Sequence, residues 1–368
     1  MSQRYQVPIG IEIATQWAWR LTIIAVAGGI GLYLLRYFSE ITVPVAIAVL
    51  VTALTVSAVD RLTAHRVPRL AATFIVVVLV LAAFFGMLAL VGQQLSTQVS
   101  DLRSNVVEGI SQVQNWAQTG PLNLTDAQVQ DWVDKAKESI GSGDASVLSR
   151  VSEVGTTLTH VLAGFFIALF SVFFFLYEGE RIWTWIVALF PRGARDRVNT
   201  SGHTAWASLT AFVRATVIVA ATDALGVAFA AWVLGVPLTF AIGVIVFLGA
   251  FIPIIGALLS GMIAVLVALV AQGPVVAGFM LIAVVVVQQI ESHVLQPFLM
   301  GRLVSVHPLA IIFAIAAGVT VAGVVGALIA VPLAACLNGV VRHLVSVAKD
   351  YQGEPEDDVG AGPEPEPA

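Results

Sequence analysis

The length of its apolar stretches limits the fold of this chain more than any other feature. A helix needs about 20 apolar residues to cross the hydrocarbon core of a bilayer. The sequence contains such stretches at 21–39, 41–59, 71–92, 155–177, 211–234, 238–271, 274–293 and 309–341. Of its 368 residues, 58% are hydrophobic and 11% are charged, and the mean hydropathy is +0.92. The sequence therefore predicts an all-α polytopic membrane protein.

The sequence offers little of the chemistry that enzymes use. Cys336 is the sole cysteine, which excludes a disulfide within one chain and a metal site built from several cysteines. There is no phosphate-binding loop, no serine at a strand-to-helix elbow and no metal-spaced histidine pair. We therefore expect no enzyme, no cofactor and no bound metal. The expected partners are the lipid bilayer and a small-molecule or cation substrate, with no nucleic acid.

Positive charges predict how the chain is oriented, because cytoplasmic loops near the spans hold the excess of Lys and Arg. Arginines flank the first span and follow the second and the fourth: Arg4, Arg20, Arg61, Arg66, Arg69, Arg181, Arg192, Arg195 and Arg197. The insert at 93–153 carries eight acidic and four basic residues. We therefore expect both termini in the cytoplasm and the insert outside. The tail at 344–368 ends in a run of Pro, Gly, Glu and Asp, which is typical of disorder.

Two segments between the spans have amphipathic patterns. In the insert, apolar residues recur at steps of three and four from Leu95 to Val113, which predicts a helix that continues out of the third span. A second helix is expected from Thr125, so that the two form a helical hairpin outside the bilayer. The apolar stripe serves either this hairpin or packing between subunits of a homo-oligomer. The cytoplasmic loop at 179–210 either lies at the membrane interface or forms a solvated linker.

The stretches 238–271 and 309–341 are too long for one simple crossing. A helix of 34 residues, the length of the first stretch, would be about 51 Å long, against a hydrocarbon core of about 30 Å. Each stretch has helix-breaking residues near its middle, which are Gly249, Pro253 and Gly256 in the first and Gly318, Gly323 and Gly326 in the second. The two also resemble each other, with PIIGALLS at 253 matching GVVGALIA at 323. This indicates an internal repeat.

We interpret the two stretches as re-entrant hairpins that leave about six full spans. The first enters from outside and the second from the cytoplasm, which gives an inverted pair with tips near the midplane, where transporters place their binding sites. Non-helical backbone is tolerated there when it lines a cavity. Two tilted or kinked spans are the alternative, and small residues at this spacing also suit plain helix packing. The length and the duplicated breaks favour the hairpins.

Asp223 is the carboxylate that lies deepest in a span. It is near the middle of 211–234, where burying a charge costs several kcal/mol. Arg214, nine residues earlier, is on the opposite face of a helix. The partner of Asp223 must therefore come from another helix or from water. Asp223 either carries a proton or cation, or makes a structural hydrogen bond to a neighbouring helix.

A polar cluster ends the span at 274–293. Glu291 falls near the inner interface, where a charged side chain costs little free energy. Its position at the end of a span is therefore one sufficient explanation for the charge. Gln288 pairs with Glu291 at i,i+3, and Gln289 pairs with His293 at i,i+4. Polarity on two faces favours contact with protein or with a wet cavity over contact with lipid. We expect this cluster to line the cytoplasmic mouth of a transport path beside the second hairpin.

The run IESHVLQPFLMGRLVSVHPLA, followed by AAGVTVAGVVGALIAVPLAA, resembles the C-terminal signature of the autoinducer-2 exporter family, a family of predicted permeases. The matching positions are Glu291, Pro297, Gly301, His307, Pro308, Gly318, Gly323, Gly326 and Pro332. The earlier run GVPLTFAIGVIVFLGAFIPIIG resembles the family through Gly235, Pro237, Gly249, Pro253 and Gly256. The resemblance is specific from about 206 to 336, and Asp223 is not part of the pattern.

The resemblance implies a multi-pass permease of the bacterial inner membrane that exports a small polar solute of the autoinducer-2 type. Some members are associated with sodium/proton antiport, which is the first alternative, and a channel or a non-transporting scaffold is the second. His307 and Pro308 are expected to mark the start of the second hairpin. The expected segments are spans 1–3 (1–92), the insert (93–153), span 4 (154–178), the cytoplasmic loop (179–210), a transport core (211–343) and the tail (344–368).

Overall fold

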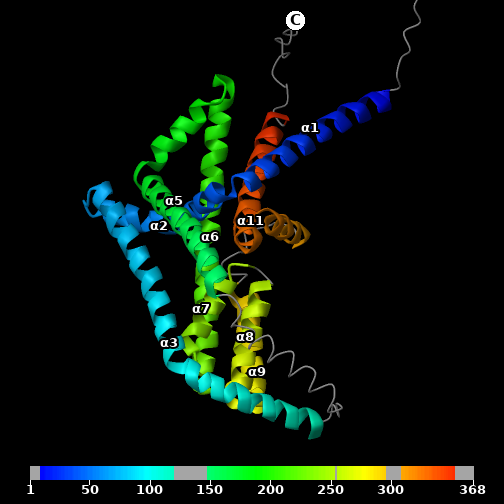
Figure 1. Cartoon of the computed structure of the whole chain (residues 1–368). Coiled ribbons are helices and arrows are strands. Elements are labelled where there is room, and N and C mark those ends of the chain that lie inside the picture. Colours follow the sequence, from blue (N-terminus) through cyan, green and yellow to red (C-terminus); the bar gives the residue numbers. More distant parts are fainter. Residues whose placement is uncertain (1–8, 120–146, 253–254, 296–307, 353–368) are drawn as a thin grey trace, which may run out of the picture.

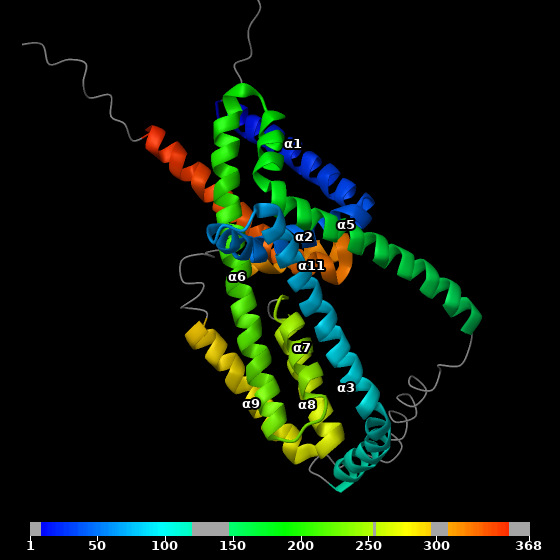
Figure 2. The ribbon, with the colours of Figure 1, turned by 90° about the vertical axis from the view of Figure 1, so that its left-hand side faces the viewer.

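The computed structural model describes residues 9–119, 147–252, 255–295 and 308–352, and these residues form helices without a strand. Seven of the helices are long and apolar enough to cross a membrane. The principal helices are α1 (Ile9–Tyr37), α2 (Ser39–Ala64), α3 (Arg69–Thr119), α5 (Val147–Ala188), α6 (Arg195–Val233), α7 (Thr239–Gly249), α8 (Ile255–Gln272), α9 (Pro274–Ile290) and α11 (Pro308–Gln352), as Figures 1 and 2 show. The predicted all-α polytopic membrane fold is confirmed.

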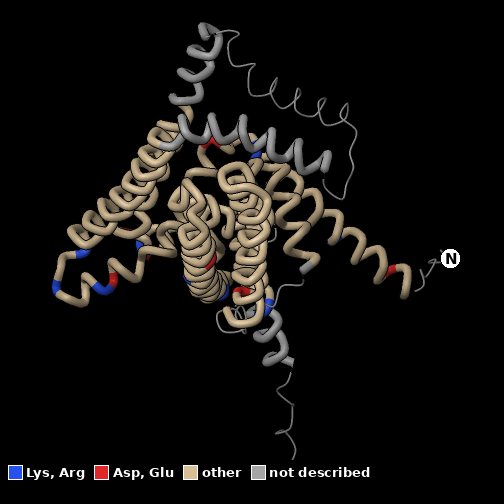
Figure 3. The backbone as a smooth tube through the Cα atoms, turned by 90° about the horizontal axis from the view of Figure 1, so that it is seen from below, with Lys and Arg blue, Asp and Glu red and all other residues tan. Residues whose placement is uncertain are grey.

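The first three spans form where the apolar stretches predict them. α1 lies at the edge of the molecule, and its apolar side chains are exposed all around it, as expected for a helix surrounded by lipid (Figure 1). α3 runs on to Thr119, so the third span continues as a helix into the insert, as its apolar stripe predicts. The second insert helix, expected from Thr125, lies outside the described residues. Figure 3 shows that charged residues gather at the end of α2 and the start of α3, while most of the chain is uncharged.

The segment 179–210 differs from the prediction of a loop. α5 continues to Ala188 after a kink at Glu178, and α6 already begins at Arg195. The Trp183 indole Nε1 donates a hydrogen bond to Asn199 Oδ1 at 2.9 Å. Arg195 donates to the carbonyl oxygens of Ala188 and Phe190, at 2.8 Å and 3.0 Å, at the end of α5. The segment is therefore a helical hairpin, because the Trp183 hydrogen bond and the arginine capping hold the two helix ends together.

The stretch 238–271 folds back on itself as α7 and α8. The backbones of Gly249 and Gly256 touch across the turn, although seven residues would separate them by about 10 Å in a straight helix. The pair packs against α6 and α9 in a core that includes Val227, Ile242 and Met280. The chain thus reverses direction where the glycines predict a break. Pro253, the third predicted residue of this break, lies outside the described residues.

Two glutamine side chains hold the base of this first hairpin. The Gln272 amide Nε2 donates to the carbonyl oxygen of Gly235 at 2.8 Å, and Gly235 has a φ of +69°. The backbone N–H of Ala241, in the first turn of α7, donates to Gln94 Oε1 of α3 at 2.9 Å. Because no side chain of α7 itself caps the first turn, α3 supplies an acceptor for one of its unpaired N–H groups.

The stretch 309–341 also reverses, within α11. The helix is interrupted at Ala322 and Gly323, where Gly323 has a φ of +59° that suits a residue without a Cβ. Gly318 and Gly326 then meet backbone to backbone, although eight residues would separate them by about 12 Å in a continuous helix. α11 begins at Pro308, a position where the missing N–H of proline costs nothing.

The two hairpins are built alike, with a glycine pair in close contact on either side of each turn. They meet at Ile252 of the first turn, which packs against a cluster that includes Ile315 and Ala327 of α11. This reversal favours hairpins over tilted or kinked spans. Their entry from opposite faces of the membrane stays a prediction. Pro332 lies inside the second arm of α11, while Pro297, Gly301 and His307 are outside the described residues.

Substituting the hairpin glycines tests these close contacts. A Cβ at residue 256 overlaps the backbone of Gly249, and one at residue 326 overlaps the backbone of Gly318. We expect Gly256→Ala and Gly326→Ala each to lower the free energy of unfolding by about 1–3 kcal/mol, the usual cost of overpacking. Thermal unfolding of the purified protein measures this. Gly278→Ala on α9 is the control, because a Cβ there meets nothing within 4 Å. Equal melting temperatures for all three variants would contradict the hairpin geometry.

Candidate functional site

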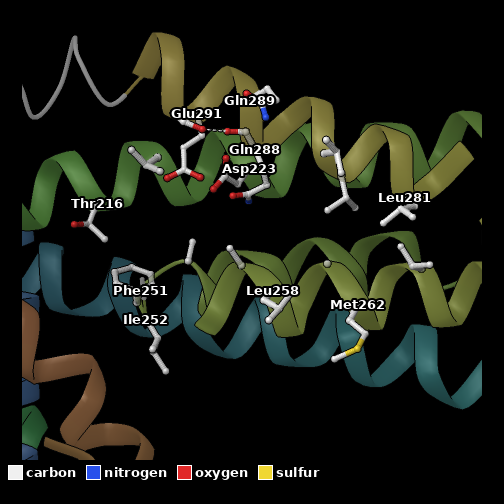
Figure 4. Close-up of a pocket in the computed structure, with 18 of the residues that line it drawn as sticks. Thr216, Asp223, Phe251, Ile252, Leu258, Met262, Leu281, Gln288, Gln289 and Glu291 are labelled. Carbon is white, nitrogen blue, oxygen red and sulfur yellow. Dashed lines mark hydrogen bonds between the residues drawn. The ribbon is translucent and has the colours of Figure 1, made fainter. Parts of the chain in front are cut away.

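A cavity of about 960 Å³ lies between α6, α8 and α9, and both hairpins contribute to it (Figure 4). The first hairpin supplies its turn, with Phe251 and Ile252, and α11 supplies Ile311 and Val331. This volume is at the upper end of the range of small-molecule sites. The cavity is the natural place to look for a binding function, because it lies where the repeated broken segments meet.

Polar side chains are concentrated in one part of the cavity. They come from α6, from the end of α9 and from the turn that follows it: Thr216, Asp223, Gln288, Gln289, Glu291 and Ser292. Most of the remaining lining is apolar and comes from α8 and α9, including Leu258, Met262 and Leu281. The cavity therefore has one polar region against a long apolar wall.

Asp223 and Glu291 form a pair of carboxyl groups in the polar region. Asp223 is 2% exposed and its oxygen Oδ1 has no hydrogen-bond partner. Its carboxyl group is within hydrogen-bonding reach of the Glu291 carboxyl group, and Figure 4 shows the two side chains close together. The partner of Asp223 thus comes from another helix, one of the two sources that the sequence allowed.

Close packing of α6 against α9 brings the pair together. Gly226, one turn after Asp223, lies against Val287, one turn before Glu291. A Cβ at residue 226 would approach Val287 Cγ2 to 2.9 Å, so a glycine is needed at this crossing. The crossing fixes how close the two carboxyl groups come.

The helix changes its winding at Glu291. α9 ends at Ile290, and Glu291–Leu295 form a π-helical turn, a feature that is frequent at functional sites. The Ser292 hydroxyl donates to the Gln288 carbonyl oxygen. His293 Nδ1 lies 3.1 Å from the Gln289 carbonyl oxygen. The wider turn presents Glu291 and Ser292 to the same cavity that Gln288 and Gln289 line.

Two carboxyl groups in a desolvated site interact strongly. If both are ionised they repel each other, and the burial of Asp223 leaves this repulsion poorly screened. Such a pair is stable when it shares a proton or holds a cation. Within the described residues, no group of three or more His, Cys, Asp or Glu side chains is placed to hold a metal ion. The geometry therefore fits proton sharing, or a cation that needs few protein ligands.

The structure brings four of the five predicted path residues together. Asp223, Gln288, Gln289 and Glu291 line the cavity, whereas His293 is exposed and is not among the lining residues. Thr216 and Ser292 were not predicted. Thr216 lies seven residues before Asp223 on one helix face, so the sequence did carry a signal for it. The apolar wall had no signal of its own, because apolar residues fill every span.

The membrane-spanning helices, the paired broken segments and the internal cavity define a polytopic membrane transporter. The family model described as AI-2E family transporter matches residues 22–346, so the chain belongs to that family. The resemblance seen over 206–336 is thus confirmed over nearly the whole chain.

Three curated proteins illustrate the similarity. "Putative transport protein MT0215" of Mycobacterium tuberculosis (strain CDC 1551 / Oshkosh) is 40% identical over 89% of this chain and 90% of its own length. "Putative transport protein YueF" of Bacillus subtilis (strain 168) is 25% identical over 79% of this chain and 81% of its own. "Putative transport protein YrrI" of the same organism is 25% identical over 84% of this chain and 88% of its own.

Replacing Asp223 by asparagine tests whether the pair of carboxyl groups destabilises the folded protein. In Asp223→Asn the amide N–H₂ can donate to Glu291, and the repulsion between two acids is removed. We expect the free energy of unfolding to rise by about 1 kcal/mol. Thermal unfolding at neutral pH measures it. Asp60→Asn, which neutralises an exposed carboxylate at the end of α2, is the matched control. A lower melting temperature for Asp223→Asn alone would mean that Asp223 makes a structural hydrogen bond.

Proposed function

We propose that this chain is a secondary transporter that exports a small polar organic solute of the autoinducer-2 type across the bacterial inner membrane. The observation that carries the proposal is the pair of the buried Asp223 and the half-buried Glu291, which line a cavity where two glycine-broken hairpins meet. Transporters bind substrates at such meeting points, because broken helices leave polar groups free for a ligand. Membership of the AI-2E transporter family supports transport, and the resemblance to the autoinducer-2 exporter family supplies the solute class.

A carrier explains the cavity better than a channel does. Ile252 at the tip of the first hairpin packs against a cluster that includes Phe212 and Ile315, so apolar side chains fill the space where the hairpins meet. A cavity closed on one side fits alternating access, in which one hairpin moves against the other around a fixed site. We infer that the chain is a transporter and not an enzyme, because the family that it belongs to is described as a transporter family.

Cation/proton antiport is the second candidate, and the same carboxyl pair favours it. A pair that holds either a proton or a cation can exchange one for the other as the cavity alternates between the two membrane faces. The antiporter uses the polar region alone, whereas a solute exporter uses the apolar wall as well. A substitution in the apolar wall should therefore impair solute export and leave cation exchange intact.

The distribution of positive charge supports one orientation of the chain in the membrane. In Figure 1, α1, the end of α11 and the α5–α6 turn lie in the upper half, while the far end of α3 lies at the bottom. Arg192, Arg195 and Arg197 at the α5–α6 turn favour the cytoplasm, since positive charge is enriched there. We therefore propose that both termini are cytoplasmic and that the insert is external. Self-association into a homo-oligomer stays a prediction.

Transport by the purified protein in liposomes tests the proposal. The vesicles contain a pH dye, and imposed sodium, potassium and lithium gradients are compared with uptake of labelled autoinducer-2. We expect saturable solute uptake with counterflow. Glu291→Gln should lower its initial rate about tenfold or more, since one charged contact at a binding site accounts for 2 kcal/mol or more. Asp60→Asn should transport at the wild-type rate, because it lies outside the cavity.

Other outcomes separate the alternatives. Cation-driven proton movement that Glu291→Gln abolishes would establish the antiporter instead. Uptake that does not saturate would indicate a channel. If neither solute nor protons move, the chain does not transport these substrates, and the exporter and antiporter proposals both fail.

A further inference from the structure

Polarity changes along the cavity from one end of α9 to the other. Leu281, Val285, Gln288 and Ser292 follow one another at steps of three and four, so they share one face of the helix. The first two are apolar and the last two are polar. Figure 4 shows Leu281 and Met262 at one end, away from Asp223 and Glu291. A ligand that lies along α9 in this cavity therefore needs an apolar part and a polar part.

The cavity is longer than its polar region. Ten residues of helix, the distance from Leu281 to Glu291, span about 15 Å. The α8 wall opposite is apolar over two turns, with Leu258, Met262 and Val265. A small polar solute of the kind proposed above would cover only part of this length, so the wall leaves room for a ligand that also has an apolar body. Hydrophobic burial against the wall would contribute to affinity only for a ligand with an apolar body.

The charge at the polar end selects a cation. Among the described residues that line the cavity, the ionisable side chains are Asp223 and Glu291, and no Lys, Arg or His is among them. An anionic ligand beside the two carboxyl groups would be repelled by any negative charge that they carry, in a poorly screened site. A single positive charge would relieve their mutual repulsion.

The way into the cavity is apolar. Leu258 is 67% exposed and Leu281 is 52% exposed, although both line the cavity, so it opens at the surface along α8 and α9. Both helices consist mainly of apolar residues, and this surface therefore faces hydrocarbon. A ligand that partitions into the bilayer can reach the carboxyl pair without crossing water.

We propose that the cavity binds an amphipathic organic cation with a single positive charge. Its apolar body lies between α8 and α9, and its charged group lies beside Asp223 and Glu291. This inference names the substrate class of the proposed transport site. It rests on that site being the binding site, but not on autoinducer-2 being the solute.

Two ions of the same shape and opposite charge test the proposal. Tetraphenylphosphonium and tetraphenylborate are both apolar, nearly identical in size and differ in the sign of their charge. Binding of each radiolabelled ion is measured by equilibrium dialysis against the full chain in nanodiscs, with empty nanodiscs subtracted. We expect saturable binding of tetraphenylphosphonium and none of tetraphenylborate.

Variants separate the two ends of the site. Glu291→Gln and Asp223→Asn should each weaken tetraphenylphosphonium binding about tenfold or more, as loss of a charged partner does. Val285→Thr keeps the shape of the wall but adds a hydroxyl group, and should weaken binding about fivefold. Asp60→Asn should bind like the wild type. Melting curves of each variant identify any that fail to fold.

Equal binding of the two ions would overturn the proposal, because the site would then select apolar shape alone. Absence of saturable tetraphenylphosphonium binding, or binding that is unchanged in both carboxyl variants, would also overturn it. The outcome of these binding experiments does not decide the outcome of the transport assay in liposomes. If solute uptake there still depends on Glu291, the transporter stands and the inferred substrate class fails.

Discussion

The structure depends on one constraint, which is that lipid cannot pair a backbone N–H or C=O group that a broken helix leaves free. The chain breaks two apolar segments and must cover both breaks with protein. It does so by folding each segment back on itself, with Gly249 against Gly256 and Gly318 against Gly326. Side chains at these contacts would push the arms apart. The two turns then cover each other through Ile252 and the α11 cluster, and the cavity beside them is a consequence of that arrangement.

A second glycine contact sets the chemistry of the cavity. Gly226 lets α6 approach α9 at Val287, and this approach places Asp223 beside Glu291. A buried acid with one unpaired oxygen next to a second acid is an unfavourable arrangement in a protein that needs only to be stable. Natural sequences keep such arrangements at functional sites and offset their cost elsewhere. Here the offset comes from the apolar core that α6 and α9 share with the first hairpin.

Much of the fold was predictable, because the length and composition of an apolar stretch indicate whether it crosses a bilayer. The spans follow from apolar runs of sufficient length, and the reversals follow from runs too long for one crossing that contain spaced glycines. The segment at 179–210, predicted as a cytoplasmic loop, is largely helical, because its charges indicate solvent exposure and not the absence of a helix. Its helices are held by Trp183 and Arg195 acting across the turn, and no periodic pattern reports such contacts.

The sequence by itself determined that this chain crosses a membrane, where it reverses and which acids lie in its spans. Spacing along the chain carries that information, since one helix has a fixed rise and rotation per residue. Only the tertiary structure decided that Asp223 meets Glu291 and that His293 lies outside the cavity. Those outcomes depend on how two helices are rotated about their own axes, on a π-helical turn at Glu291 and on the close approach at Gly226. The rotations and the close approach arise from packing between segments distant in sequence, so one segment alone does not determine them.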